Sequence, residues 1–140
     1  MNRSASVQWK GSLKEGQGII NSESGVLSNI SYSFSKRFGD EKGTNPEELI
    51  GAAHASCFTM AFSSELAKLK MKADTIDVKA TVTLDKEGEG WKISASHLDV
   101  TANVPDASKS DVETAAETAK KNCPVSKLLN ANISMNLKVS

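Results

Sequence analysis

The segment from Pro46 to about Leu69 limits most strongly how this chain can fold, because it contains no residue other than Gly51 that opposes a helix. Gly51 costs such a helix only about 1 kcal/mol. Pro is well suited to the first helical position, where its missing N–H leaves no hydrogen bond unmade. The sequence therefore predicts one long helix that starts at Pro46.

Two residue pairs compete to cap this helix. Asn45 with Glu48 and Thr44 with Glu47 both have the spacing of a capping box, in which a polar side chain and an acid three residues later satisfy free N–H groups. The sequence does not decide between the two pairs.

Strands are predicted on both sides of the long helix. Two runs follow it, separated by the turn KEGEG, and each alternates apolar and polar residues as a half-buried strand does. The second run changes parity near His97, which predicts a β-bulge or a bend. A third run ends the chain, and the N-terminal third, rich in Gly, Asn and Ser, predicts a small antiparallel meander. The apolar positions of the three runs include Ile76, Val78, Ala80, Val82, Leu84, Trp91, Ile93, Ala95, Leu98, Val100, Ala102, Val104, Ile133, Met135, Leu137 and Val139.

A second, shorter helix is predicted between the second and third runs. Ser110 and Glu113 have the form of a capping box, and the apolar stripe that follows ends near Asn122. Cys123 and Pro124 then open a short helix with the sequence PVSKLLN. Strand runs interrupted by helices indicate an α+β fold with a mainly antiparallel sheet, and 140 residues suggest a single domain, 1–140.

The charge balance argues against nucleic acid or an anionic membrane as the main partner. Seventeen basic and seventeen acidic residues cancel. The chain also has no apolar run near the roughly 20 residues that span a bilayer. The N-terminal residues MNRSASVQWKGS lack the apolar core of a secretory signal, so we expect a cytoplasmic protein.

Two cysteines raise the question of chemistry. Cys57 lies within the long helix and Cys123 lies 66 positions later, so the chain contains no CxxC redox or metal motif. The flanking residues of Cys57 are apolar, and burial alone raises the pKa of a thiol and makes it inert. Activation requires a fixed positive charge, for which the guanidinium of Arg37 is the best candidate. At the start of its short helix, Cys123 would be favoured as a thiolate or as a leaving group.

Helix geometry separates the two acids that follow Pro46. At about 100° per residue, Glu47 lies within about 80° of Cys57, whereas Glu48 lies about 180° from it. His54 lies on a neighbouring face, three residues before Cys57. Glu47, His54 and Cys57 therefore share one broad side of the helix.

Axial distance complicates a site made from one helix. Ten residues place Glu47 about 15 Å from Cys57, too far for both to contact one small substrate. A two-fold dimer in which antiparallel copies of the helix cross would bring the Glu of one copy near the Cys of the other. Small residues that would permit this approach are Gly51, Ala52, Ala53, Ala55 and Ser56.

Besides a redox pair formed by Cys57 and Cys123, two other functional classes stay open from the residues alone. Cys57, Cys123 and His54 could bind Zn²⁺ in a metal-binding sensor, although three ligands are too few for a closed structural site. The chain could also be a non-enzymatic stress protein whose two thiols are inert core residues.

The segments FSKRFGDEKGTNPEELIGAAHASCFTMAFS and NCPVSKLL together resemble the OsmC/Ohr family of osmotically inducible and organic-hydroperoxide-resistance peroxidases. The resemblance covers nearly the whole chain. It is closer to the OsmC branch, because of three pieces: EKGTNPEELIGAAHA, the dipeptide Cys57–Phe58 that follows one residue later, and ESGVL. It implies an OsmC-like α+β fold and an intertwined homodimer, with the long helices central and two active sites at the interface.

The resemblance also implies roles for four residues. Cys57 matches the peroxidatic cysteine and Cys123 the resolving cysteine. Arg37 matches the arginine that holds the thiolate, and Glu47 matches the glutamate that pairs with this arginine. The implied activity is reduction of organic hydroperoxides, and of hydrogen peroxide as a further substrate, through a Cys57 sulfenate and a Cys57–Cys123 disulfide. The implied reductant is a dithiol, the dihydrolipoyl group of a lipoylated protein, and no metal, haem or flavin is required.

Overall fold

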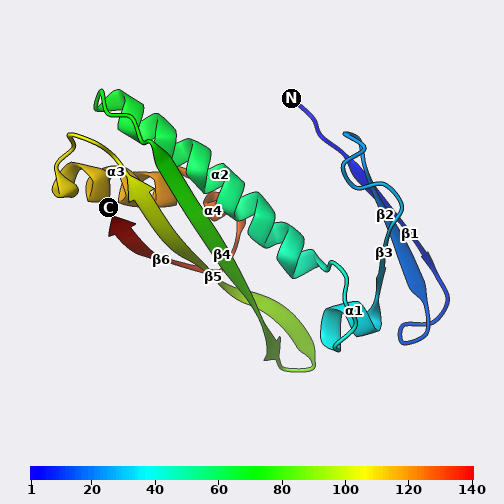
Figure 1. Ribbon diagram of the computed structural model, residues 1–140. Coiled ribbons are helices and arrows are strands. Elements are labelled where there is room, and N and C mark those ends of the chain that lie inside the picture. Colours follow the sequence, from blue (N-terminus) through cyan, green and yellow to red (C-terminus); the bar gives the residue numbers. More distant parts are fainter. The chain divides into compact units, whose positions relative to one another are not determined.

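The computed structural model describes all 140 residues, which divide into two compact units, residues 1–49 and 50–140 (Figure 1). The first unit contains three strands, β1 (Ala5–Lys10), β2 (Gln17–Ser22) and β3 (Ile30–Ser33), paired antiparallel in the order β1-β2-β3. This confirms the predicted N-terminal meander. The expectation of a single domain stays a prediction.

A close approach between side chain and backbone stabilises the meander. The rings of Trp9 on β1 and Tyr32 on β3 lie 5.4 Å apart across Gly18 on the middle strand. A Cβ atom at Gly18 would lie 2.1 Å from the Tyr32 ring, so no other residue fits there without moving the ring. Glycine at this position thus allows an aromatic pair to cover the middle strand.

The short helix α1 (Phe34–Phe38) follows β3 and was not predicted from the sequence. Its N-cap is Ser33, whose hydroxyl accepts a hydrogen bond from the Lys36 backbone N–H at 3.2 Å. The rings of Phe34 and Phe38 lie one turn apart, with centroids 4.9 Å apart. A five-residue helix has too few residues to show a helical period, so its sequence gives no clear signal.

The long helix α2 (Pro46–Lys68) begins at the residue predicted and ends one residue before Leu69. Asn45 is its cap: the side-chain oxygen of Asn45 accepts from the backbone N–H of Glu48 at 2.8 Å. Thr44 instead donates its hydroxyl to the Glu48 carboxylate at 2.9 Å. The structure thereby decides the question that the sequence left open.

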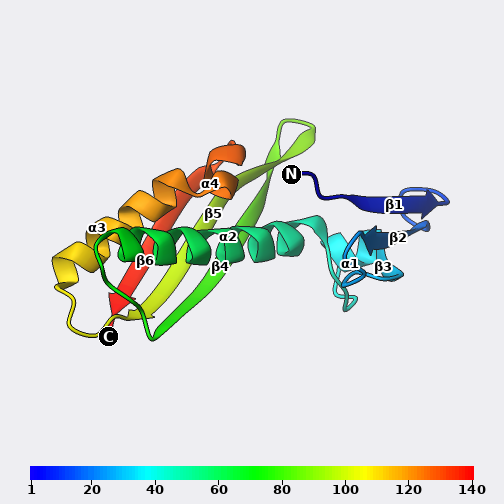
Figure 2. The ribbon, with the colours of Figure 1, turned by 90° about the horizontal axis from the view of Figure 1, so that it is seen from above.

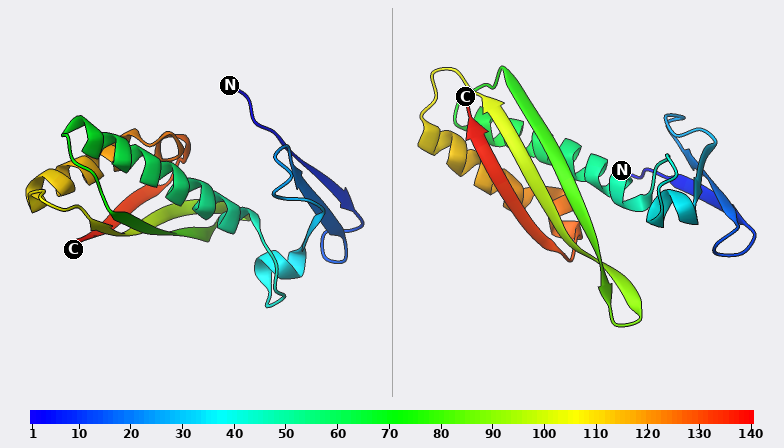
Figure 3. Two further views of the ribbon diagram at one scale, coloured as in Figure 1. Left: turned by 45° about the horizontal axis from the view of Figure 1, so that its top comes forward. Right: turned by 60° about the horizontal axis from the view of Figure 1, so that its bottom comes forward.

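The second unit is a three-stranded sheet with helices on one face. The sheet has the order β4-β5-β6, and α2 and α3 lie together on the same face of it, which is the far face in the right view of Figure 3 (also Figure 2). Its elements are β4 (Thr75–Glu87), β5 (Gly90–Asn103), α3 (Lys109–Asn122), α4 (Pro124–Leu128) and β6 (Asn132–Val139). The α+β class is confirmed, as is the order of the predicted elements.

One strand pairing differs from the expected mainly antiparallel sheet. β4 and β5 pair antiparallel, but β5 and β6 pair parallel. The reason is the connection: α3 and α4 lie between β5 and β6 in the chain, and a crossover through a helix is how parallel neighbours are joined. The sheet is therefore mixed.

Two local expectations are corrected as well. The capping box at Ser110 is wrong, because α3 begins at Lys109 and its N-cap is Ser108, which accepts from the Asp111 N–H at 3.1 Å. The irregularity expected near His97 lies closer to the hairpin, where the pairing register shifts between Thr83 and Leu84.

The core of the second unit is formed between the sheet and the two long helices. Because the inward positions of β5 alternate with exposed ones, one face of this central strand packs against both helices. The buried apolar residues include Phe58, Phe62 and Leu66 from α2, Leu98, Val100 and Ala102 from β5, and Val112, Ala115, Ala116 and Ala119 from α3. None of the helices combines the length and the apolar composition that a membrane-spanning segment needs.

Candidate active site

Cys57 and Cys123 meet in the second unit. Cys57 lies in the middle of α2 and is half-buried, while Cys123 lies between α3 and α4 and is fully buried. Both thiols are free, and they lie close enough for Cys123 to raise the pKa of Cys57. The fold thus brings together two cysteines that are 66 positions apart in the sequence.

The environment of Cys57 disfavours its thiolate. Burial raises the pKa of the Cys57 thiol above its ordinary value, and the neighbouring side chain of Cys123 raises it further. A hydrogen bond from the backbone of Val125, in α4, acts in the opposite direction and favours the charged form. A reactive Cys57 therefore needs an additional positive charge nearby.

His54 is fully buried one turn before Cys57 and uses both ring nitrogens. Nδ1 is joined to the Ser96 hydroxyl at 2.6 Å and Nε2 to the Ser126 hydroxyl at 2.8 Å. Burial lowers the pKa of His54 below 6.5, because the imidazolium loses its hydration. We call these three residues the His54 bridge.

The zinc alternative required His54, Cys57 and Cys123 to converge on one ion. No group of three or more His, Cys, Asp or Glu side chains is arranged to hold a metal ion. Both ring nitrogens of His54 are also occupied by serine hydroxyls. The structure gives this alternative no support.

Arg37 and Glu47 form an ion pair in the first unit. The guanidinium contacts both carboxylate oxygens, with Nη2 2.6 Å from Oε1 and Nε 3.2 Å from Oε2. Such two-pronged pairs fix the plane of the guanidinium as well as its position. Arg37 also lies against the ring of Phe38, with its central carbon 5.1 Å from the ring centroid.

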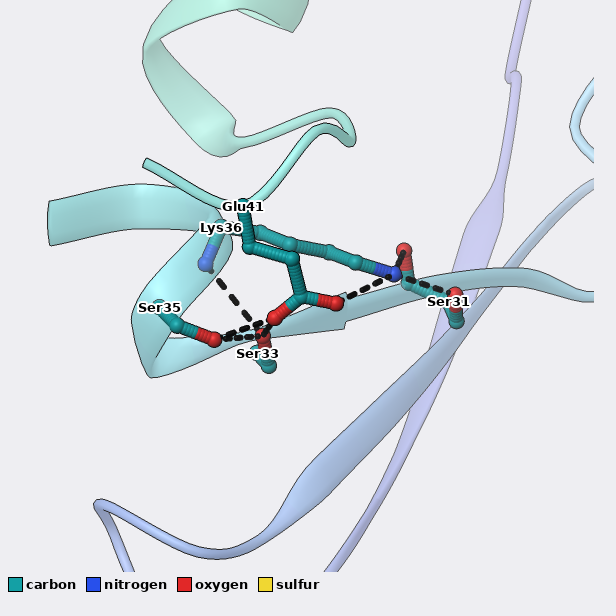
Figure 4. Close-up of polar contacts among 5 residues, drawn as sticks. All are labelled: Ser31, Ser33, Ser35, Lys36 and Glu41. Atoms are coloured by element: carbon teal, nitrogen blue, oxygen red, sulfur yellow. Dashed lines mark hydrogen bonds and ion pairs between the residues drawn. The ribbon is translucent and has the colours of Figure 1, made fainter. Parts of the chain in front are cut away.

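A cluster of polar residues lies at the start of the helix that carries Arg37 (Figure 4). The Glu41 carboxylate accepts hydrogen bonds from the Ser33 and Ser35 hydroxyls. Its other oxygen lies 3.7 Å from Lys36 Nζ, which also donates to the Ser31 hydroxyl at 2.7 Å. We call Ser31, Ser33, Ser35, Lys36 and Glu41 the Glu41 cluster; it ties the loop after α1 to α1 and β3.

The Glu41 cluster makes its carboxylate more acidic. The hydrogen bond from Ser35 lowers the pKa of Glu41 most, against the effect of its desolvation, and Ser33 and Lys36 lower it further. The carboxylate is therefore ionised over the whole neutral range.

The sequence predicted Cys57, Cys123, Arg37 and Glu47 as site residues, and the structure brings them together as two pairs, one in each unit. Sequence reasoning missed Ser96, Ser126 and Glu41. A serine on a strand or in a short helix has no pattern that indicates a buried histidine partner, so no signal could have found the two serines.

The site thus contains two neighbouring free thiols and a separate Arg37–Glu47 ion pair, all on an α+β scaffold. The chain belongs to the OsmC family, described as OsmC-like protein, whose model matches residues 39–138. Glu47, Cys57 and Cys123 lie inside the matched range, and Arg37 lies two residues before it.

Individual proteins give the same assignment. The chain is 42% identical to peroxiredoxin OsmC of Escherichia coli over 96% of its own length and 94% of that protein. It is 39% identical to organic hydroperoxide resistance protein-like 1 of Staphylococcus saprophyticus over 71% of each chain. An OsmC-like protein of unknown function from Vibrio cholerae has the same fold, with a TM-score of 0.77 at 22% identity over 98% of this chain and 99% of the other.

Proposed function

We propose that this chain is a cysteine-based peroxidase that reduces organic hydroperoxides to alcohols. The observation that carries the proposal is the contact between the thiols of Cys57 and Cys123. Relatives named peroxiredoxin and organic hydroperoxide resistance protein support it. The half-buried Cys57 is the attacking thiol because it is the more accessible of the two, and the buried Cys123 is the resolving thiol.

The reaction proceeds in three steps. The Cys57 thiolate attacks the distal oxygen of the hydroperoxide; an S–O bond forms, the O–O bond breaks, and the alkoxide leaves as an alcohol after taking a proton. Cys57 is then a sulfenic acid. Cys123 condenses with it, which forms the disulfide and releases water, and an external dithiol returns both cysteines to thiols by exchange.

Arg37 supplies the positive charge that Cys57 needs, and Glu47 orients it. Burial raises the pKa of the Cys57 thiol, so a thiolate at neutral pH requires a cation beside it. A guanidinium held by a carboxylate fork stays ionised and keeps free N–H groups for a thiolate and a peroxide oxygen. Arg37 and Glu47 therefore stabilise negative charge as it moves from sulfur to oxygen.

The active site belongs to a homodimer. Within the single helix α2, Glu47 and Cys57 are separated by about 15 Å along the axis, so one peroxide contacts both only if they come from different chains. The composition of α2 favours such pairing, because Ala52, Ala53 and Ser56 are exposed on the single chain. Small residues at these positions let a second helix approach closely, and a two-fold axis places two equal sites at one interface.

The reductant is a dithiol, for which we propose the dihydrolipoyl group of a lipoylated protein. A cycle that is reset by thiol exchange requires a reducing compartment, so we propose that the protein works in the cytoplasm. Ala61, one turn after Cys57, is partly buried and packs with it against the apolar core, which favours an alkyl hydroperoxide over hydrogen peroxide.

Steady-state turnover tests the function. The purified protein is given cumene hydroperoxide with either dihydrolipoamide or thioredoxin as reductant, and hydrogen peroxide is compared as substrate. We expect turnover with dihydrolipoamide and a higher kcat/KM for the organic peroxide. A protein that consumes no peroxide with any dithiol would overturn the proposal.

A further inference from the structure

His54 is a buried titratable group that the proposed reaction does not use. It is completely inaccessible to solvent, yet it is placed among apolar residues of α2 such as Phe58. Burying an imidazole is costly unless both ring nitrogens find partners. The two serine hydroxyls of the His54 bridge meet this requirement, and they come from two different elements.

One end of the bridge is rigid. Ser96 lies on β5, the central strand of the sheet, and is itself completely buried. Its hydroxyl holds Nδ1 of His54 at 2.6 Å. The imidazole is therefore fixed between the long helix and the middle of the sheet.

The other end of the bridge holds the segment that carries the resolving thiol. Ser126 lies in α4, whose N-cap is Cys123. The N–H of Lys127 donates to the Cys123 carbonyl at 3.1 Å, so Cys123 and Ser126 belong to the same helical turn. Val125, in that turn, makes the backbone hydrogen bond to Cys57.

We propose that His54 is a positioning residue for the resolving step, which it serves by holding α4 through Ser126 so that Cys123 stays against Cys57. This inference rests on the proposed peroxidase cycle. A five-residue helix has little stability of its own, because most of a helix's stability comes from length and packing. The bond from His54 Nε2 to Ser126 is a part-buried anchor that compensates for this.

The resolving step depends on the separation of the two sulfur atoms. The sulfur of Cys123 attacks the sulfur of the Cys57 sulfenic acid; an S–S bond forms, the S–O bond breaks, and hydroxide leaves with the proton of the Cys123 thiol as water. The peroxide has already supplied the oxidising equivalents, so no further oxidant is needed. A displacement of about 1 Å costs such a reaction on the order of a hundredfold.

The two ring nitrogens can be tested separately. A glutamine amide reaches the position of Nε2 and can bond Ser126, whereas an asparagine amide reaches only the position of Nδ1 and can bond Ser96. His54→Gln is expected to keep the resolving rate near that of the wild type. His54→Asn and Ser126→Ala are expected to slow it about tenfold or more.

The chain offers a matched control. His97 Nδ1 is joined to the Ser134 hydroxyl at 2.6 Å, between β5 and β6. His97 is the neighbour of Ser96 on β5, so its side chain points to the other face of the sheet. Ser134→Ala removes a hydrogen bond of the same kind without touching α4, and should leave the resolving rate unchanged.

The experiment follows both chemical steps in single turnover with cumene hydroperoxide. Peroxide loss reports the first step. Mass spectrometry of samples quenched with a sulfenic-acid reagent reports how long the Cys57 sulfenate persists before the disulfide forms. We expect a longer-lived sulfenate in Ser126→Ala and His54→Asn, with a smaller slowing of peroxide loss because the same turn carries the Val125 backbone hydrogen bond to Cys57. Combining both changes should cause no further slowing, because both remove the same link.

The outcomes separate the two proposals. A wild-type protein that consumes no cumene hydroperoxide contradicts the peroxidase itself. If the wild type cycles but Ser126→Ala resolves as fast as the wild type, the positioning role is overturned. It is also overturned if Ser134→Ala is slowed equally, or if peroxide loss slows as much as disulfide formation. Ser126 is only part-buried and the change deletes one oxygen, so this variant keeps the test valid even if His54 variants do not fold.

Discussion

The guanidinium nitrogens of Arg37 lie 2.6 and 3.2 Å from the two carboxylate oxygens of Glu47. The carboxylate of the next residue, Glu48, instead accepts a hydrogen bond from the Thr44 hydroxyl. Two consecutive acids at one helix start therefore do different work. Glu47 is committed to the guanidinium, and Glu48 belongs to the capping of α2, where its N–H also bonds Asn45.

This difference predicts unequal effects of removing the two acids. Glu47→Gln should slow peroxide loss severalfold or more, because the guanidinium is no longer held in plane. Glu48→Gln should affect mainly the stability of α2, by about 1 kcal/mol or less. Equal slowing of peroxide loss by the two glutamine variants would count against the assignment.

Arg37→Ala should raise the pKa of Cys57, so that its reaction rate is low at neutral pH and climbs as the pH rises toward that pKa. The pH dependence of Cys57 alkylation measures this shift.

Replacing each of the two cysteines should impair the peroxidase cycle at a different step. Cys57→Ser should abolish peroxide reduction, because an alcohol cannot form a sulfenate. Cys123→Ser should consume about one equivalent of peroxide per chain and then stop turning over with dithiols, since no disulfide can form. Peroxide titration followed by steady-state assay distinguishes them, and wild-type turnover by Cys57→Ser would disprove the mechanism.

The Glu41 cluster should influence the peroxide step through Arg37. Glu41→Ala removes the acceptor that ties the loop after α1 to Ser33, Ser35 and Lys36. The arginine on α1 is then held less firmly, so peroxide loss should slow modestly while disulfide formation keeps its rate. Glu15→Ala, another exposed acid of the same unit, is the control. A change in neither step for Glu41→Ala would show that the cluster does not position Arg37.

Acid should weaken the fold through His54. Burial lowers the pKa of folded His54 below 6.5, so between that lowered pKa and 6.5 the unfolded chain binds a proton that the folded chain does not. Stability therefore falls as the pH drops through this window, by up to about 1.4 kcal/mol per pH unit, and levels off below the folded pKa. His54→Gln should lack this component. Urea unfolding of both proteins at several pH values measures it, and parallel pH profiles would refute it.

Local sequence signals predicted much of the fold. The uninterrupted run after Pro46 gave the long helix nearly to the residue, and alternating residues gave the strands. The parallel pairing of β5 with β6 could not be read from those strands, because alternation reports which residues face the core and not the direction of a neighbour. That information lies in the crossover through α3 and α4.

The site divides in the same way. Helix phase alone favours Glu47 over Glu48, since it depends only on spacing within one element. The contacts of His54 with Ser96 and Ser126 join residues 42 and 72 positions away, and no local pattern encodes such distances. The same holds for the meeting of Cys57 with Cys123, which the sequence indicated only through its resemblance to a family.

Subunit complementation tests whether each active site is built from two chains. The Arg37→Ala protein, which is slow at neutral pH, and the Cys57→Ser protein, which is inactive, are unfolded together and refolded as mixed dimers. If Arg37 of one chain serves Cys57 of the other, every heterodimer has one site in which both residues are wild type. Half of a statistical mixture is heterodimer with one of two sites intact, so about a quarter of the wild-type activity should return.

The control for complementation pairs Arg37→Ala with Glu47→Ala. These two residues form one ion pair within a single chain, at 2.6 Å, so no mixed dimer restores an intact fork and activity should stay at the level of the separate variants. Recovery of activity in the first mixture and none in the control supports a site shared between subunits. The physical reason for sharing is that Glu47 and Cys57 lie about 15 Å apart along α2, which is about ten residues of helical rise. Confirmed heterodimers of Arg37→Ala with Cys57→Ser that regain no activity would place Arg37 and Cys57 of each site in the same chain.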